Sequence, residues 1–220
     1  MKTLFYALIL SWILPISLGN ASEQDRTAFF LPEIDAFSQW DKENSFPKRA
    51  VLFVGSSSIN YWPSAEAFPE VPIINRGFGG SISTDILYFY DRVIAKYRPR
   101  TVVIYVGDND IALGLTAEKT SDTLKILIQK IAHDFPKTRI IYLPIKPSLL
   151  RWDMWPDMKK VNENIANYAK KSKHVFYIDS ATPLLGADGM PDKKYFVDDG
   201  LHLNEAGYRI WNKLLEPYLK

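Results

Sequence analysis

Cysteine is absent from this chain of 220 residues, and several kinds of site are excluded with it. Zinc ribbons, iron–sulfur clusters, thiol catalysis and structural disulfides all require cysteine thiols. A lipidated N-terminal cysteine is excluded for the same reason. Histidine is scarce too, with three residues, so a step that needs an imidazole has few candidates.

A surplus of charge of one sign is missing as well. Lys and Arg number 27, Asp and Glu 25, the formal net charge is +2, and no Lys/Arg cluster stands out along the sequence. This balance argues against a nucleic-acid-binding protein, which would rely on neutralising phosphates. With 47% hydrophobic and 24% charged residues, the composition is globular and excludes intrinsic disorder. The length, without an internal repeat or a linker, favours one domain.

Long apolar runs are confined to the N-terminus. After a positively charged start, residues 4–18 are almost wholly apolar, and small residues at Gly19 and Ala21 precede a polar stretch. This order is typical of a secretory signal peptide, so we predict one at residues 1–21, with cleavage after Ala21. The alternative is an uncleaved membrane anchor, but the run falls short of the roughly 20 residues that a spanning helix needs. We expect the mature chain, residues 22–220, to be periplasmic or secreted, without stable membrane insertion.

Five short runs rich in Val, Ile, Phe and Tyr predict buried strands. The runs do not alternate cleanly with polar residues, which is typical of a parallel sheet covered on both faces. Their bounds are Ala50–Val54, Pro72–Asn75, Thr101–Val106, Arg139–Leu143 and Val175–Ile178.

Apolar residues at helical spacing follow these strands. Asn204, just before the last of the apolar stripes, is a predicted helix N-cap. Strands that alternate with helices form right-handed β-α-β units. We therefore predict an α/β fold with three layers, α/β/α, around a five-stranded parallel sheet. The four stripes run from Ile86 to Tyr97, Leu124 to Phe135, Met158 to Ala169 and Tyr208 to Tyr218.

Polar clusters follow the predicted strands, at the edge where ligand sites lie in open α/β sheets. The clusters are Gly55–Ile59, Asn75–Ser81, Gly107–Asp110 and Asp198–His202. Each alone has an ordinary structural explanation as a turn, a helix cap or a surface pair. Together they supply a hydroxyl nucleophile, a histidine base, a carboxylate to orient the base, and amide donors. These are the parts of serine acyl-transfer chemistry.

Competing motifs fail on spacing. A nucleophile elbow, G-x-S-x-G, would need glycine where Ile59 stands. A Walker loop would need a Gly-Lys pair, which the sequence lacks, and the dinucleotide pattern G-x-G-x-x-G does not follow Gly77. A calcium loop that started at Asp108 would have Lys119 where a glutamate is required.

In their order along the chain, the four clusters resemble the blocks of the SGNH hydrolase family, also called GDSL-type esterases and lipases. The resemblance extends from about Ala50 to Tyr208. It implies the flavodoxin-like SGNH hydrolase fold, with residues 22–220 as a single domain. It also implies a serine esterase that hydrolyses carboxylic esters and uses no metal or organic cofactor. The predicted signal peptide implies that this esterase is exported.

The resemblance assigns a role to each site residue. Ser57 would be the nucleophile, His202 the general base and Asp199 the carboxylate that orients the base. The backbone N–H groups of Ser57 and Gly80 and the side-chain amide of Asn109 would form the oxyanion hole.

Some positions leave alternatives open. The family's usual Asp of the first block is Ser56 here, so three consecutive serines compete for the nucleophile's place, and the family pattern chooses the second. The subset that the chain resembles most, with G-S-S-S-I as its first block, commonly has serine at that position. Trp152 and Trp155 either line the acyl pocket or pack within the fold. The remaining histidines, His133 and His174, are interpreted as surface residues.

The resemblance narrows the substrate to a small-molecule, carbohydrate or lipid ester. We expect a short acyl group on a carbohydrate or on a lipid-like alcohol. A lysophospholipase or a thioesterase of the same family is the alternative with the same chemistry. A catalytically silent ligand-binding protein on this fold is the alternative from another class. No nucleic-acid partner is expected.

Overall fold

The structure of the protein is a computed structural model that describes residues 23–219. The predicted signal peptide at residues 1–21 lies outside the described residues. All five predicted strands are present, with bounds that differ from the predicted ones by two residues at most. Strands β1 to β5 span Val51–Gly55, Ile73–Gly77, Thr101–Tyr105, Arg139–Tyr142 and Val175–Tyr177.

Helices connect the strands and follow the last of them. The α-helices are α1 Glu23–Glu43, α2 Ser57–Asn60, α3 Ser64–Ala67, α4 Ser83–Tyr88, α5 Tyr90–Val93, α6 Asp108–Ala112, α7 Ala117–Asp134, α8 Trp155–Ala169 and α9 Glu205–Leu219. Short 3-10 helices are η2 Ala95–Tyr97, η3 Trp152–Met154, η4 Thr182–Leu184 and η5 Lys193–Tyr195.

The sheet has the strand order β2-β1-β3-β4-β5, and every pair of neighbours is parallel. This is the flavodoxin-like order, in which the chain continues first on one side of β1 and then on the other. The last residue of β1, Gly55, pairs with Gly77 of β2 and with Tyr105 of β3. The loops that follow these three strands therefore start side by side, at the switch point where ligands bind in such sheets.

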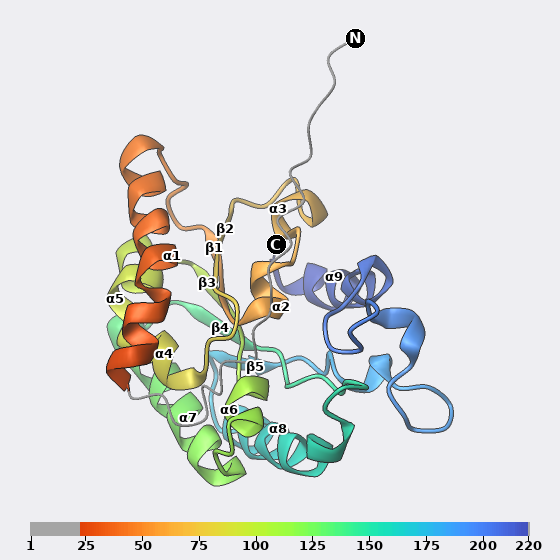
Figure 1. The fold of residues 1–220 in the computed structure, drawn as a ribbon. Helices are drawn as coiled ribbons and strands as arrows, with labels where there is room; N and C mark the ends of the chain where they lie inside the picture. Colours follow the sequence, from red (N-terminus) through yellow and green to blue (C-terminus); the bar gives the residue numbers. More distant parts are fainter. Residues whose placement is uncertain (1–22, 220) are drawn as a thin grey trace.

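Each face of the sheet has its own hydrophobic core, because alternate residues of a strand point to opposite faces. In β1, Leu52 and Val54 belong to one core, and Val51 and Phe53 belong to the other. Helices α1, α4, α5, α7 and α8 cover the first face, and α2, α3 and α9 cover the second (Figure 1). The predicted three-layer α/β/α architecture is thus confirmed.

The helix predicted from Ile86 to Tyr97 is not continuous. It is divided into α4, α5 and η2, with breaks at Phe89 and Ile94. The residues of the predicted stripe are nevertheless buried on the first face of the sheet. The apolar spacing therefore predicts correctly which side chains face the core, although the backbone bends between them. The N-cap prediction holds, since the Asn204 side chain accepts a hydrogen bond from the N–H of Gly207.

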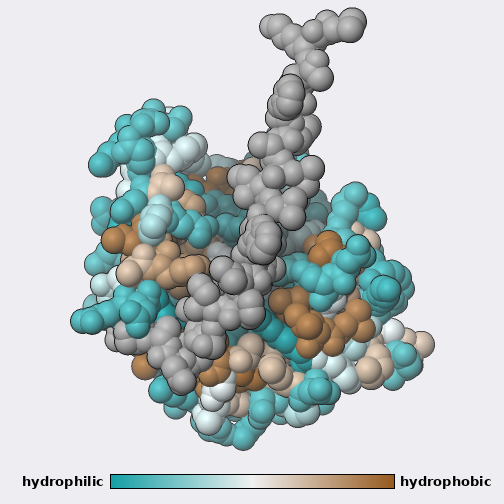
Figure 2. Space-filling model, viewed as in Figure 1, coloured by the Kyte–Doolittle hydropathy of each residue, from teal (hydrophilic) through white to brown (hydrophobic). Residues whose placement is uncertain are grey.

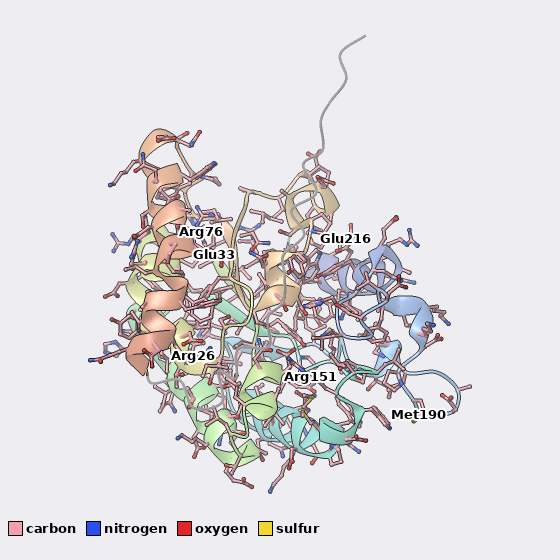
Figure 3. The ribbon with its side chains drawn as sticks, in the orientation of Figure 1. Arg26, Glu33, Arg76, Arg151, Met190 and Glu216 are labelled. Atoms are coloured by element: carbon pink, nitrogen blue, oxygen red, sulfur yellow. The ribbon has the colours of Figure 1, made fainter. Side chains whose placement is uncertain are left out.

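The spacing of apolar residues does not predict helix α1, and its packing explains why. Phe30 and Ile34 are buried against the sheet, whereas Phe29 and Leu31 of the same turns are exposed. Charged side chains supply much of the attachment, and Figure 3 shows two of them, Arg26 and Arg76, where α1 meets its neighbours. Ion pairs between α1 and its neighbours include Arg26–Asp85, Arg76–Asp41, Arg92–Asp35 and Lys96–Asp41.

The surface viewed in Figure 2 is mainly hydrophilic, with hydrophobic residues in small groups. Among residues 23–219, none of the helices combines the length and the apolar character needed to cross a bilayer.

Candidate active site

The three consecutive serines after β1 have different surroundings. Ser56 and Ser58 are buried, and Ser57 is partly exposed at the start of α2. The hydroxyl of Ser56 lies 3.5 Å from a carboxylate oxygen of Asp108. Ser58 lies beneath Tyr208, whose hydroxyl donates to its backbone carbonyl at 3.0 Å. Of the three, Ser57 is the one whose hydroxyl faces a histidine.

Ser57, His202 and Asp199 form one hydrogen-bonded chain. The Oγ of Ser57 lies 2.9 Å from Nε2 of His202, although 145 residues separate them. On the other side of the ring, Nδ1 of His202 lies 2.6 Å from Oδ2 of Asp199. A hydroxyl, an imidazole and a carboxylate are thus in line, with both ring nitrogens engaged.

The loop that holds Asp199 and His202 is fixed by its own backbone. Oδ1 of Asp199 accepts hydrogen bonds from the N–H groups of Leu201 and His202, at 2.8 and 2.9 Å. Burial raises the pKa of the Asp199 carboxyl, but the hydrogen bonds from His202 and Leu201 outweigh burial and leave this pKa below its usual value. The ring of Tyr61 meets the imidazole edge to face, with 5.1 Å between the centroids.

The loop after β2 lies next to the serine because two residues of β2 bind α2. The Asn75 amide donates to the carbonyl of Ile59 at 2.8 Å, and its oxygen accepts from the N–H of Gly77. A Cβ at Gly77 would lie 2.5 Å from the backbone nitrogen of Asn60, so only glycine allows this close approach. Gly80 has a φ of +79°, a left-handed conformation that glycine adopts without strain.

Helix α6, which closely follows β3, places Asn109 beside the loop after β2. The Asn109 side-chain amide donates one hydrogen bond to the carbonyl of Ser81 at 3.0 Å, and this NH₂ group has a second N–H. Asp110 accepts hydrogen bonds from both the backbone and the hydroxyl of Ser83. Burial raises the pKa of Asp110 to about 6, against the opposing effect of the Ser83 hydrogen bonds. The segment after β2, which carries Gly80, is therefore tied to α6, which carries Asn109.

Arg26 of helix α1 is a residue of this region that the four sequence blocks do not include. Its guanidinium pairs with Asp85 through two nitrogens, and Nη2 also donates to the carbonyl of Gly80 at 3.3 Å. Asp85 in turn accepts from the N–H of Ile82 at 2.8 Å. The acidic residue at the start of α4 is a recognisable capping signal, but nothing in the sequence connects it with Arg26.

Two further residues that the blocks do not include, Lys146 and Arg151, lie beside Asp108 at the start of α6. Asp108 pairs with Arg151 at 3.1 Å, and the ammonium of the buried Lys146 lies 4.0 Å from the same carboxylate. The Lys146 ammonium also lies 3.3 Å from the hydroxyl of Tyr105. Burial lowers the pKa of Lys146 to about 8. Figure 3 labels Arg151 beside α6, the helix that begins at Asp108.

The remaining candidates of the sequence lie outside this centre. The His133 ring is exposed and contacts Asp134, and His174 is exposed just before β5. Trp152 and Trp155 stack on each other, with 6.0 Å between the centroids, and Trp155 packs against the core of the first face. No group of His, Asp and Glu side chains within residues 23–219 has the arrangement of a metal site.

Comparisons with known proteins agree with this geometry. Residues 59–210 match the GDSL-like Lipase/Acylhydrolase family. The chain is 25% identical over 164 residues to platelet-activating factor acetylhydrolase IB subunit alpha1 of Bos taurus, which covers 72% of this chain and 69% of that protein.

Two solved structures share the fold. A GDSL-like lipase from Bacteroides thetaiotaomicron superposes with a TM-score of 0.73 at 21% identity, covering 84% of this chain and 98% of the other. An acetylxylan esterase from Geobacillus stearothermophilus superposes with a TM-score of 0.65 at 15% identity, covering 80% and 96%. With the family match over most of its length, the chain belongs to the GDSL-like lipase/acylhydrolase family, also known as the SGNH hydrolases, and is an ester-hydrolysing enzyme.

Proposed function

We propose that the protein is an exported serine esterase whose nucleophile, base and orienting acid are Ser57, His202 and Asp199. The observation that carries this proposal is the continuous hydrogen-bonded chain of these three side chains. Both distances lie within the range in which a proton passes between a base and a nucleophile.

The proposed reaction proceeds in two steps. Ser57 Oγ attacks the ester carbonyl while Nε2 of His202 takes its proton, and the protonated imidazole then gives that proton to the leaving alcohol. Water then attacks the acyl-enzyme while Nε2 of His202 takes its proton, and the imidazolium returns a proton to Ser57 as the acid leaves. The ionised Asp199 holds the ring so that Nε2 faces Ser57, and it stabilises the imidazolium.

The negative charge of the tetrahedral intermediate needs donors that are in place before the reaction. In the proposal these are the N–H groups of Ser57 and Gly80 and the second N–H of the Asn109 amide. The left-handed backbone at Gly80 and the Asn109 hydrogen bond to Ser81 set the directions of two of the donors.

The proposed substrate is an ester with a short acyl group on a carbohydrate or on a lipid-like alcohol. The names of two similar proteins, a platelet-activating factor acetylhydrolase subunit and an acetylxylan esterase, refer to acetyl groups. Purified protein should react with a fluorophosphonate probe, which labels only an activated serine. It should also hydrolyse chromogenic acetate esters faster than long-chain esters. Absence of labelling would favour the alternative of a catalytically silent ligand-binding protein. A preference for lysophospholipids or thioesters would favour the alternative with the same chemistry.

We expect kcat/KM for a neutral ester to rise between about pH 5 and pH 8 with the loss of one proton. Asp199 keeps its charge throughout this range, because its pKa is lowered from an already acidic value. Histidine is the side chain that ordinarily changes charge in this interval, and a general base must be neutral to accept the serine proton. Asp110, with a pKa of about 6, also ionises in this interval, so the variant Asp110→Asn, which should keep the same rise, is the control. A pH profile of kcat/KM tests this. A profile that stays flat while acylation limits the rate would exclude His202 as the base.

Arg26→Lys should lower kcat by roughly three- to tenfold with little change in KM. Lysine keeps a positive charge beside Asp85, but its shorter side chain has one donor nitrogen in place of the Nε and Nη2 that contact Asp85 and the Gly80 carbonyl. Loss of one such hydrogen bond is worth about 1 kcal/mol. The matched control is Arg92→Lys, since Arg92 also holds α1, through Asp35 and the carbonyl of Ile34. Equal losses in both variants would show that Arg26 acts only by attaching the helix.

A further inference from the structure

Basic residues lie at or just before the start of four of the five strands, in pairs whose members are adjacent or one residue apart. These pairs are Lys48–Arg49 before β1, Arg98 and Arg100 before β3, Lys137 and Arg139 at β4, and Lys173–His174 before β5. No cluster is visible along the sequence, because a whole βα unit separates one pair from the next. In a parallel sheet, however, the amino ends of all strands meet at one edge.

Backbone hydrogen bonds place these pairs side by side. The N–H of Arg100 donates to the carbonyl of Ala50, and the N–H of Arg139 donates to the carbonyl of Arg100. Ile140 is linked in the same way to His174. The basic edge lies at the opposite ends of the strands from Ser57, Asn109 and the loops that carry the triad.

Two adjoining hollows of about 430 and 360 Å³ open at this edge. Both hollows are lined by Arg49, Arg100 and Lys137. The first adds Arg98, and its one carboxylate, Asp134, already lies 3.2 Å from the ammonium of Lys130. The second has no carboxylate among its described lining residues and adds Arg139, Lys173 and His174.

The arginines of the chain divide into two groups by their partners. Of nine arginines, five form an ion pair with a carboxylate: Arg26, Arg76, Arg92, Arg151 and Arg209. The other four all line the hollows, and none of them forms an ion pair within residues 23–219. These are Arg49, Arg98, Arg100 and Arg139.

The guanidinium groups that do have partners there are bonded to uncharged acceptors. Arg100 and Arg139 donate to the carbonyls of Leu219 and Tyr218 at the end of α9, and a carbonyl carries no net charge. Arg49 and Arg98 have φ values of 54° and 45°, a left-handed conformation in which no other non-glycine residue of the described chain is found. Strained backbone of this kind often occurs where a ligand is held.

We propose that the two hollows form a binding site for a soluble anion with two or more phosphate groups. A guanidinium fork matches the oxygens of a phosphate with two parallel hydrogen bonds. A phosphate group carries close to two negative charges at neutral pH, so a ligand with several phosphates balances the cations of both hollows, whereas one carboxylate balances a single cation. Three residues shared by the two hollows allow one ligand to span both.

Calorimetric titration of the mature chain with inorganic tripolyphosphate tests the proposal. The triple variant Arg49→Gln/Lys137→Gln/Lys173→Gln should bind roughly tenfold or more weakly, because each substitution removes a charge-assisted hydrogen bond. The matched control, Lys42→Gln/Lys159→Gln/Lys213→Gln, has the same change in net charge at exposed positions away from the hollows and should retain binding. Hydrolysis of a chromogenic ester should be unchanged in both variants, which verifies folding.

Three results would overturn the proposal. The first is failure of the wild-type chain to bind tripolyphosphate at millimolar concentration. The second is an equal loss of affinity in both triple variants, which would show an effect of net charge alone. The third is binding to vesicles that contain phosphatidylglycerol without binding to tripolyphosphate, which would make the edge a contact surface for anionic lipid. None of these results bears on the triad.

Discussion

Ser57→Ala should abolish ester hydrolysis and fluorophosphonate labelling while the protein stays folded. The hydroxyl is partly exposed and donates to no buried group, so its loss leaves no unpaired partner in the core. In a well-studied serine protease, loss of the nucleophile lowers kcat by roughly 10⁶. Initial rates with a chromogenic acetate ester, together with gel detection of the probe, measure this effect.

The neighbouring serines are natural controls for this variant. Ser56→Ala and Ser58→Ala should both be labelled and active, because the hydroxyls of these residues lie away from the imidazole. Labelling of the Ser57→Ala variant would identify another nucleophile and refute the assignment. Loss of labelling in all three variants would point to a damaged loop, which thermal unfolding would reveal.

Asn109→Ala should lower kcat and kcat/KM together by about 10²–10³, with KM little changed. The amide donates to a negative charge that exists only after the carbonyl carbon has been attacked, so substrate binding barely depends on it. The effect corresponds to roughly 3–4 kcal/mol of transition-state stabilisation. Steady-state kinetics with one ester are sufficient to separate kcat from KM.

Asn109→Asp distinguishes this role from a structural one. Aspartate has nearly the same size, but it replaces both N–H donors with a negative charge and therefore also loses the hydrogen bond to Ser81. A merely structural Asn109 would give a lower melting temperature with near-normal turnover. Turnover close to that of the wild type in Asn109→Asp would mean that the oxyanion has other donors.

The strands and the cores could be predicted from the sequence because each strand is a short, continuous apolar run. Helix α1 could not, because its attachment depends on ion pairs with residues far along the chain, such as Arg26 with Asp85. Long-range ion pairs leave no period in a sequence. The break between α4 and α5 could not be predicted either. The apolar spacing from Ile86 to Tyr97 is that of one helix, although the backbone does not form a continuous helix there.

The triad residues could be predicted from the sequence, whereas Arg26 and the basic residues at the amino ends of the strands could not. Ligand sites lie at the carboxyl ends of parallel strands, and the four clusters occur in the order of the family's blocks. Together these two observations predict that Ser57 lies near His202, and the structure has these side chains in contact. The roles of the residues stay predictions. Neither observation predicts a role for Arg26, because this residue lies before the first strand. Neither predicts the basic edge, because its residues lie at the amino ends of the strands, where no family block occurs.

Helix α1 lies close to the proposed cleavage site. The family match begins at residue 59, so the Arg26 contact with Gly80 is made by a segment that precedes it. With the proposed cleavage after Ala21, only residues 22–25 separate the new N-terminus from Arg26. A protease that trimmed a few residues further would leave the triad and both cores in place but remove this contact. The activity of the exported protein would then depend on the position at which the signal peptide is cleaved.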